Sequence, residues 1–192
     1  MTDTEAPRWQ VREQPITLPA AAVNRHSRLT VAHVLLPDGM KFSQVVLRVD
    51  PAAMCVLVNE RGEVLMMRRH RFIPDLDVWE VPGGYLDRRP DGEFEDPAAC
   101  AEREAVEEAG WRPGRVEHLV TFEPMTGTAT APNHVYLGLE PRAVDGAAMD
   151  VNEGAEVRWI PLADVPAMVA GMTLGAASVI GLLAARERLG VR

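Results

Sequence analysis

The segment REAVEEAG, residues 103–110, carries three glutamates whose spacing could bring their carboxylates together. In a helix, Glu104, Glu107 and Glu108 stand at positions i, i+3 and i+4 and share one narrow stripe. Like charges four residues apart cost an isolated helix roughly 0.2–0.5 kcal/mol, so the stripe needs a reason. Clustered carboxylate oxygens are the ligands that Mg²⁺ prefers. The stripe therefore predicts a site for a hard cation, and the alternative is an acidic face that only meets solvent.

The flanking residues predict that this helix begins after Asp96 and ends before Gly110. Asp96 is a favourable N-cap, and Pro97 suits the first helical position because its missing N–H would be unpaired there anyway. Gly110 is the usual residue for a left-handed C-cap. The small apolar residues of the segment, four alanines and a valine, fall on the side opposite the glutamates. One face would therefore anchor the helix in the core while the other presents carboxylates.

The helix is expected to lie among strands. Two hairpins precede it, residues 28–36 with 40–49 and residues 52–58 with 63–69, followed by a short strand at 78–81. Strands at 115–123, 134–140 and 155–162 follow it, and residues 1–28 are expected to be irregular because of their prolines. A short helix and a second helix from about Thr173 to Leu189 close the chain. This order predicts an α+β layered fold, with a strand region at 1–50 and the main domain at 51–192.

Composition excludes several classes of function. The formal net charge of −8 argues against nucleic acid as a partner, because phosphate backbones need a basic footprint. The two cysteines, Cys55 and Cys100, show no C-x-x-C spacing and are expected to be buried free thiols. Residues 165–185 carry no charge, but Pro166 and the Gly171–Thr173 stretch interrupt them, so we expect two helices and no membrane span. The N-terminus lacks a signal-peptide pattern, and we expect a cytoplasmic protein.

The glutamate helix and its surroundings resemble the Nudix box. That signature runs Gly, five residues, Glu, seven residues, and then Arg-Glu-apolar-x-Glu-Glu-x-Gly-apolar. Glu95, seven residues and the run REAVEEAGW, ending at Trp111, match its second part, and VWEVPGG resembles the strand and turn that introduce it. Ten residues separate Gly84 from Glu95, which we interpret as a five-residue insertion around Arg88–Gly92. Glu93 is the alternative to Glu95 but would leave nine residues before Arg103.

The resemblance implies a Nudix-type α/β/α sandwich with a mixed sheet, preceded by an N-terminal antiparallel hairpin. It implies hydrolysis of a diphosphate linkage assisted by Mg²⁺, which Mn²⁺ can replace. Arg103 would orient the glutamates. The oxygen ligands of the metal would come from Glu104, Glu107, Glu108 and Glu95, and from the backbone near Gly84.

The segment VLMMRRHRFIPDLDVWEVPGGYLD resembles the ADP-ribose and ADP-sugar pyrophosphatase group. In that group Arg71 would contact substrate and Glu80 would be a carboxylate on the substrate side. The alternative is that the arginines of this strand form a solvated strand end. A glutamate in the loop before the last strand, Glu153 or Glu156, would be the general base, and Glu104 is a third candidate.

We therefore expect hydrolysis of a nucleoside diphosphate linked to a sugar or similar moiety, giving a nucleoside monophosphate and a sugar phosphate. The TGTATAPN loop, residues 126–133, lacks the acidic residue that the group usually carries there, which argues against ADP-ribose itself. The alternatives are a house-cleaning pyrophosphatase acting on nucleoside triphosphates and a regulatory module that binds ligand without catalysis. We also expect a homodimer through residues 1–50, because the first hairpin is too apolar for an isolated pair of strands.

Overall fold

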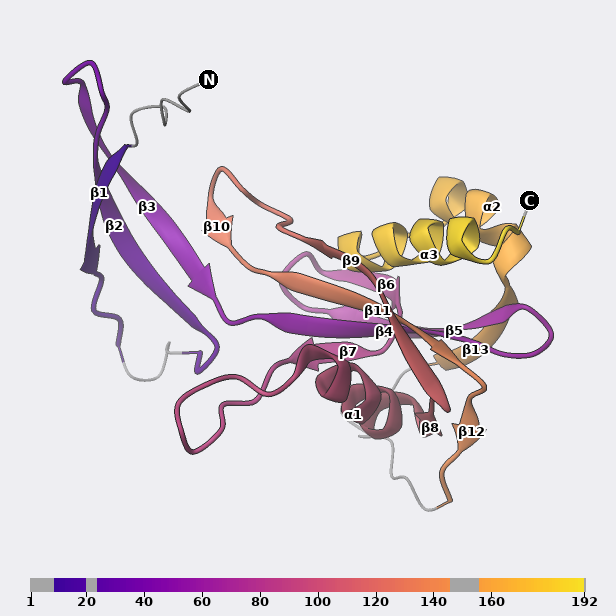
Figure 1. Cartoon of the computed structure of the whole chain (residues 1–192). Coiled ribbons are helices and arrows are strands. Elements are labelled where there is room, and N and C mark those ends of the chain that lie inside the picture. The colour runs from indigo at the N-terminus through magenta and orange to yellow at the C-terminus, as the bar shows by residue number, and fades with distance from the viewer. Residues whose placement is uncertain (1–8, 20–23, 146–155, 192) are drawn as a thin grey trace, which may run out of the picture. The chain divides into compact units, whose positions relative to one another are not determined.

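The computed structural model describes residues 9–19, 24–145 and 156–191. These form two compact units. The first comprises the described residues up to Asp50 together with Met125–Ala131, and the second comprises Pro51–Pro124 and the described residues from Pro132 onward. Figure 1 gives the element labels used below.

The first unit is a four-stranded sheet with the order β1-β2-β3-β10. It consists of β1 (Gln10–Pro15), β2 (Ser27–Leu35), β3 (Lys41–Val49) and β10 (Ala129–Thr130). The β2–β3 pair is the predicted antiparallel hairpin. The expectation that residues 1–28 are irregular was wrong for β1, which pairs antiparallel with β2 from Gln10↔Leu35 to Pro15↔Thr30. Pro15 does not prevent this pairing, because it stands at the end of β1 rather than inside it.

The second unit is built on a seven-stranded mixed sheet, in which five strands follow the order β13-β5-β4-β11-β9. Strands β6 and β7 extend it by pairing with β5 and β4. The β4–β11 ladder is parallel, and the other ladders are antiparallel. The strands are β4 (Ala52–Val58), β5 (Glu63–Arg71), β6 (Leu76–Glu80), β7 (Gly83–Tyr85), β9 (Arg115–Phe122), β11 (Asn133–Leu139) and β13 (Glu156–Pro161). A short separate pair joins β8 (Trp111–Arg112) to β12 (Arg142–Ala143).

Helices cover both faces of this sheet. Figure 1 shows α1 (Pro97–Ala109) on one face and α3 (Ala176–Arg188) on the other, with α2 (Val165–Gly171) beside α3. Alternate residues of β4 enter two separate cores: Ala53, Cys55 and Leu57 pack on the α1 side, and Met54, Val56 and Val58 pack on the α3 side. A strand buried on both faces reads as a continuous apolar run, as AAMCVLV does. The predicted α/β/α sandwich with a mixed sheet is confirmed.

The uncharged C-terminal run folds as the two expected helices, after a short 3₁₀ turn at Leu162–Asp164. Its small residues have a packing role. A Cβ built on Gly181 would stand 2.9 Å from side-chain carbons of Val135 and Val56, so α3 approaches the sheet closely only because this position is glycine. Within the described residues, no helix is both long and apolar enough to cross a membrane. Cys55 and Cys100 are both buried free thiols.

Candidate active site

Local sequence sets the glutamate helix as predicted. The Asp96 side chain accepts hydrogen bonds from the backbone N–H of Ala98 at 2.7 Å and of Ala99 at 3.4 Å. Gly110 ends the helix in the left-handed conformation, with φ of 71°. The face of small residues, including Ala101 and Ala105, is buried against β4 and β7. The expectation that the glutamates lie opposite this face was wrong. Glu108, seven residues after Ala101, lies almost directly above it on the helix, and Glu104 and Glu108 pack against the Gly83–Gly84 turn. Of the three glutamates, only Glu107 is exposed.

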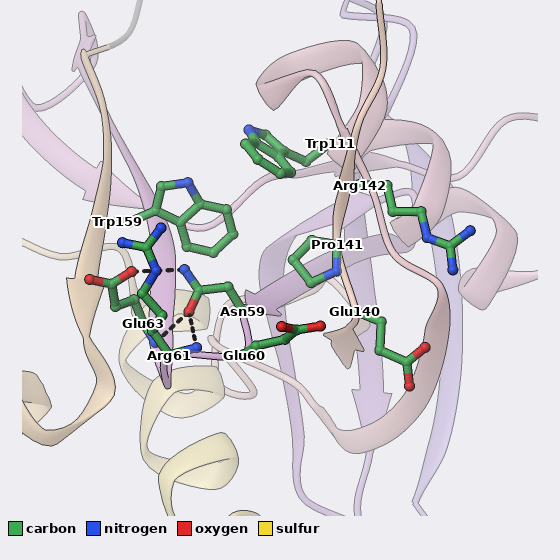
Figure 2. A pocket seen from close by; sticks show the side chains of 9 residues that line it. All are labelled: Asn59, Glu60, Arg61, Glu63, Trp111, Glu140, Pro141, Arg142 and Trp159. Carbon is green, nitrogen blue, oxygen red and sulfur yellow. Dashed lines mark hydrogen bonds between the residues drawn. The ribbon is translucent and has the colours of Figure 1, made fainter.

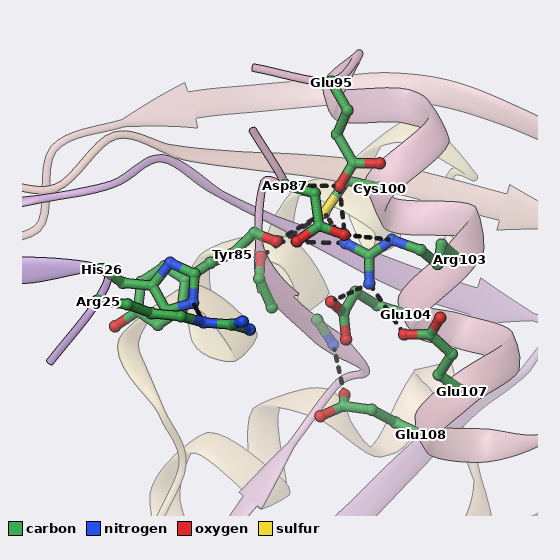
Figure 3. A network of polar contacts seen from close by, with 12 residues as sticks. Arg25, His26, Tyr85, Asp87, Glu95, Cys100, Arg103, Glu104, Glu107 and Glu108 are labelled. Carbon is green, nitrogen blue, oxygen red and sulfur yellow. Dashed lines mark hydrogen bonds and ion pairs between the residues drawn. The ribbon is translucent and has the colours of Figure 1, made fainter. Parts of the chain in front are cut away.

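A guanidinium group lies among these carboxylates (Figure 3). Arg103 Nη1 donates to Glu104 Oε1 at 2.7 Å and to Glu107 Oε2 at 2.9 Å. Its Nη2 donates to Glu95 Oε1 at 2.7 Å and to the carbonyl of Tyr85 at 3.2 Å. Arg103 therefore offsets the repulsion that the glutamate stripe would otherwise create.

Glu108 has different partners. Its Oε2 accepts from the backbone N–H of Gly83 at 2.7 Å, and its Oε1 accepts from Arg69 Nη1 at 2.7 Å. The side chain is only 8% exposed, whereas that of Glu107 is 57% exposed. Glu104 and Glu108, one helical turn apart, are thus bound by different arginines.

Burial dominates the electrostatics of Glu104. Loss of solvent raises the pKa of its carboxyl to about 7, although Arg103 pulls that pKa down, and Glu108 and Glu107 add to the increase. The carboxylate lies directly against the Gly84 backbone. A Cβ built on Gly84 would stand 2.5 Å from Glu104 Oε1, so any other residue here would collide with this carboxylate.

The donor set fits an oxygen-seeking divalent cation. It consists of the carboxylates of α1 and Glu95 and the backbone around Gly84, a notch in which the Glu104 carboxylate packs where another residue would carry its Cβ. Within the part of the chain that the structure describes, no three acidic, histidine or cysteine side chains converge as a ready-made ligand set. Arg103 instead binds Glu95, Glu104 and Glu107.

The five-residue insertion is an ordered loop. The backbone N–H of Glu95 donates to the carbonyl of Asp87, and that of Arg89 donates to the carbonyl of Glu93, at 2.9 and 2.8 Å. The guanidinium of Arg88 lies 4.2 Å from the centre of the Phe94 ring. The loop closes at its base, where the Asp87 N–H donates to Glu95 Oε1 at 2.9 Å. This closure brings Glu95, with the spacing of seven residues, to Arg103.

The two residues predicted to face the substrate, Arg71 and Glu80, are in contact. Arg71 of β5 donates to Glu80 Oε2 of β6, at 2.9 Å from Nε and 2.6 Å from Nη2. The alternative of a solvated strand end fails for Arg69, whose side chain is 9% exposed. We missed Arg69 as a site residue, although its position two residues before Arg71 places both on one face of β5.

The three candidate bases differ in environment. Glu156 is exposed at the start of β13 and is paired with Arg158 and, at 3.8 Å, with Arg68. Glu104 is buried in the carboxylate cluster. Glu153 lies outside the described residues.

A separate hollow of about 610 Å³ lies elsewhere in the second unit (Figure 2). Trp111 and Trp159 pack edge to face there, with ring centres 5.2 Å apart. The lining residues are Asn59, Glu60, Arg61, Glu63, Trp111, Glu140, Pro141, Arg142 and Trp159. None of them belongs to the carboxylate cluster, so this hollow is not the candidate active site.

Comparison with known proteins agrees with this geometry. The NUDIX domain family matches residues 48–180. A CMP-5'-(N-acetyl-N-hydroxy-3-aminopropyl)phosphonate hydrolase of Streptomyces rubellomurinus is 41% identical over 162 residues, covering 84% of this chain and 76% of that protein. An ADP-ribose pyrophosphatase of Bacillus subtilis is 28% identical over 143 residues, covering 73% of this chain and 74% of the relative.

A solved structure, that of an ADP compounds hydrolase, shares the fold with a TM-score of 0.78 at 16% identity, covering 96% of this chain and 95% of that one. The resemblance to the Nudix family is confirmed. The chain belongs to the Nudix family, resembles its ADP-ribose pyrophosphatase group, and is a hydrolase of diphosphate linkages.

Proposed function

We propose that this Nudix hydrolase uses Mg²⁺, which Mn²⁺ can replace, to cleave a nucleoside diphosphate joined to a sugar or similar group. The products would be a nucleoside monophosphate and a phosphorylated second half. The observation that carries the proposal is the packing of Glu104 and Glu108 against the Gly83–Gly84 turn. This packing gathers hard oxygen atoms at a backbone notch, which suits a divalent cation better than a solvated acidic face would.

The metal would be held by the carboxylates of Glu104, Glu107, Glu108 and Glu95 together with the carbonyl of Gly84. When bound, a divalent ion neutralises charge on phosphoryl oxygens and makes a water nucleophilic at neutral pH. Arg103 contacts three of these carboxylates and would set their orientation. Groups that hydrogen-bond to metal ligands, as Arg103 would here, commonly fix the orientation of those ligands.

For the general base, we retain Glu153, one of the two loop glutamates that the resemblance indicates, with Glu104 and Glu156 as the alternatives. A pKa of about 7 suits a base at neutral pH, which supports Glu104. Glu156 has the least support because two arginines neutralise it. Replacing each glutamate by glutamine separates the three. The base variant should lower kcat far more than metal affinity, and the other two should not.

On the substrate side, Arg71 and Glu80 are the proposed contacts. Arg71 is half-exposed and supplies a guanidinium close to the carboxylate cluster, as an anionic substrate requires. Of the two curated relatives described above, one is named for ADP-ribose and the other for a CMP-linked phosphonate. Both names describe a nucleoside monophosphate unit joined to a second group. We therefore assign the nucleoside monophosphate half as the common part of the substrate.

A second candidate substrate is a CMP-linked phosphonate. The 41% identity to the Streptomyces rubellomurinus hydrolase favours it, and so does the TGTATAPN loop, which departs from the ADP-ribose pattern. The chemistry would be the same, because the bond broken is again a phosphorus–oxygen–phosphorus anhydride.

The test is a substrate panel with Mg²⁺ and chromatographic separation of products. It comprises ADP-ribose, other nucleoside diphosphate sugars, CMP-linked phosphonates, dinucleoside polyphosphates and nucleoside triphosphates. Release of nucleoside monophosphate from a sugar- or phosphonate-linked compound supports the proposal. Preferred release of inorganic pyrophosphate from triphosphates would assign the chain to the house-cleaning pyrophosphatases. Tight binding without turnover would indicate a regulatory module.

We also propose a homodimer through the first unit. Exposed apolar side chains lie together on one face of that unit: Val11 and Phe42, both opposite Val34 of β2, are 54% and 39% exposed. Trp9 and Phe42 pack edge to face, with ring centres 6.2 Å apart, and extend this surface. Such a patch is larger than isolated exposed residues would give. Light scattering at micromolar concentration should give twice the chain mass, and a monomer would disprove this assignment.

The setting we propose is cytoplasmic. Cys55 and Cys100 are free and buried, which supports a reducing compartment. No nucleic-acid partner is proposed, because the net charge of −8 would repel a phosphate backbone.

A further inference from the structure

Arg69 is a buried cation that lies between Glu108 of α1, a proposed metal ligand, and Glu80 of β6, a proposed substrate contact. Its Nη1 is 2.7 Å from Glu108 Oε1 on α1, and its Nε is 3.7 Å from Glu80 Oε2 on β6. Glu80 Oε2 is also the atom that Arg71 binds, at 2.6 Å. A continuous polar chain therefore runs from Arg71 through Glu80 and Arg69 to Glu108.

The chain continues into the backbone. The other oxygen of Glu108 accepts from the N–H of Gly83, which precedes the notch at Gly84. Glu80 is enclosed as well, since a Cβ built on Gly175 would stand 3.0 Å from Glu80 Oε1. Both carboxylates that contact Arg69 are thus held in confined positions. Small displacements of the guanidinium would move both of them.

Burial makes this arrangement sensitive to substitution. The side chains of Arg69 and Glu108 are 9% and 8% exposed, so removal of either leaves the other charge largely desolvated. Lysine could keep the charge, but its single ammonium lacks the planar fork that lets a guanidinium contact two carboxylates at once. Arg68, the neighbour on β5, is exposed and pairs with Asp77 at 2.8 Å and, at 3.8 Å, with Glu156, the candidate base with the least support. It therefore offers a matched control.

We propose that Arg69 is a positioning residue. It fixes the carboxylates of Glu108 and Glu80 relative to each other, and it thereby links Arg71, the proposed substrate contact, to α1, which carries the proposed metal ligands. This inference rests on the proposed function, because it assigns Glu108 to the metal and Arg71 to the substrate. The observed partners of Arg69 are carboxylates: Glu108 at 2.7 Å and Glu80 at 3.7 Å. Arg69 acts through these two carboxylates.

The experiment compares Arg69→Met, Arg69→Lys and the control Arg68→Met in the full chain. Steady-state kinetics at saturating Mn²⁺ use the best substrate of the panel, and thermal unfolding is recorded in chelator and in Mn²⁺. Arg69→Met should lower kcat about 10- to 100-fold, as loss of a ligand-orienting partner does. KM should rise as well, because the Arg71–Glu80 pair loses its support. Arg69→Lys should be intermediate, and Arg68→Met should stay within twofold of the wild type.

Thermal unfolding provides the readout that does not depend on turnover. Arg69→Met should unfold at lower temperature in chelator, and Mn²⁺ should raise its melting temperature by more than that of the wild type. The reason is that the bound ion then supplies the counter-charge that Glu108 has lost. A purely structural role would lower stability alone, leaving kcat, KM and the response to Mn²⁺ unchanged in the folded variant.

The outcomes separate the two proposals. If the wild type neither binds Mn²⁺ nor turns over the panel, the proposed function fails, and this inference fails with it. If the wild type is active and Arg69→Met matches Arg68→Met in kcat, KM and the Mn²⁺ response, only the inference is overturned. Should Arg69→Met not fold, Arg69→Lys decides, and wild-type kinetics in Arg69→Lys would overturn the inference.

Discussion

Two arginine networks serve the same helix, and they differ in burial. Arg103 is partly exposed and binds three carboxylates of the outer part of the cluster. Arg69 is buried and lies between Glu108 and Glu80, which come from different elements. We expect the outer network to rearrange more readily than the inner one on metal binding, because the side chain of Arg103 is 27% exposed and that of Arg69 is 9% exposed. The glutamate stripe thus combines an adaptable side with a rigid side.

Breaking the inner network should have the largest effect. Glu108→Gln removes a proposed metal ligand and the partner of a buried guanidinium, so we expect kcat to fall by about two to three orders of magnitude. Stability should also fall, by about 1–3 kcal/mol, because Arg69 keeps only an uncharged acceptor. Activity assays and chemical denaturation measure both. Full activity with excess chelator would remove the catalytic role of the helix.

Breaking the outer network should cost less. Arg103→Met removes the group that orients Glu95, Glu104 and Glu107, and we expect a 10- to 100-fold loss of kcat at saturating Mg²⁺. A Mg²⁺ titration of activity should show partial recovery at high metal, because the ion replaces part of the missing positive charge. Loss of activity equal to that of Glu108→Gln would show that the two networks do not differ as described.

Titration of Glu104 sharpens the comparison. Its pKa is raised from 4.5 to about 7, so the native state binds this proton more tightly than the unfolded state does. In chelator, the group therefore destabilises the protein above pH 7, and this destabilisation is relieved as the pH falls from about 7 towards 4.5. Glu104→Gln cannot ionise and should be more stable than the wild type at pH 8. The two proteins should converge near pH 5 in thermal unfolding, and a constant difference would contradict the assignment.

The exposed member of the stripe should matter least. Glu107 is 57% exposed, and its ion pair among the described residues is with Arg103, so Glu107→Gln should change stability by less than about 1 kcal/mol. Calorimetric titration should show a weaker Mg²⁺ affinity than in the wild type, with a smaller loss than in Glu108→Gln. A loss as large as that of Glu108→Gln would mean that burial does not rank these ligands.

Local sequence determined the glutamate helix and its limits. Asp96, Pro97 and Gly110 act on their own backbone or on residues a few positions away, so the helix over Pro97–Ala109 could be predicted without knowledge of any partner. The same holds for the two C-terminal helices and for the apolar runs of the central strands. The spacing of Glu104, Glu107 and Glu108 on one stripe is also a property of helix geometry alone.

Only the tertiary structure decided how that stripe is used. Arg69 and Glu108 are 39 positions apart in the chain, and their contact depends on the packing of β5 against the end of α1. Strand alternation in RRHR places Arg68 and Arg69 on opposite faces of β5, but it does not indicate which of the two is buried, because burial here is set by a helix that follows much later. Strand β1 was missed for the same reason: its residues are exposed and weakly patterned, and they are held extended by pairing with β2. Backbone conformation and capping follow from neighbours in sequence, whereas charge pairing and strand pairing follow from neighbours in space.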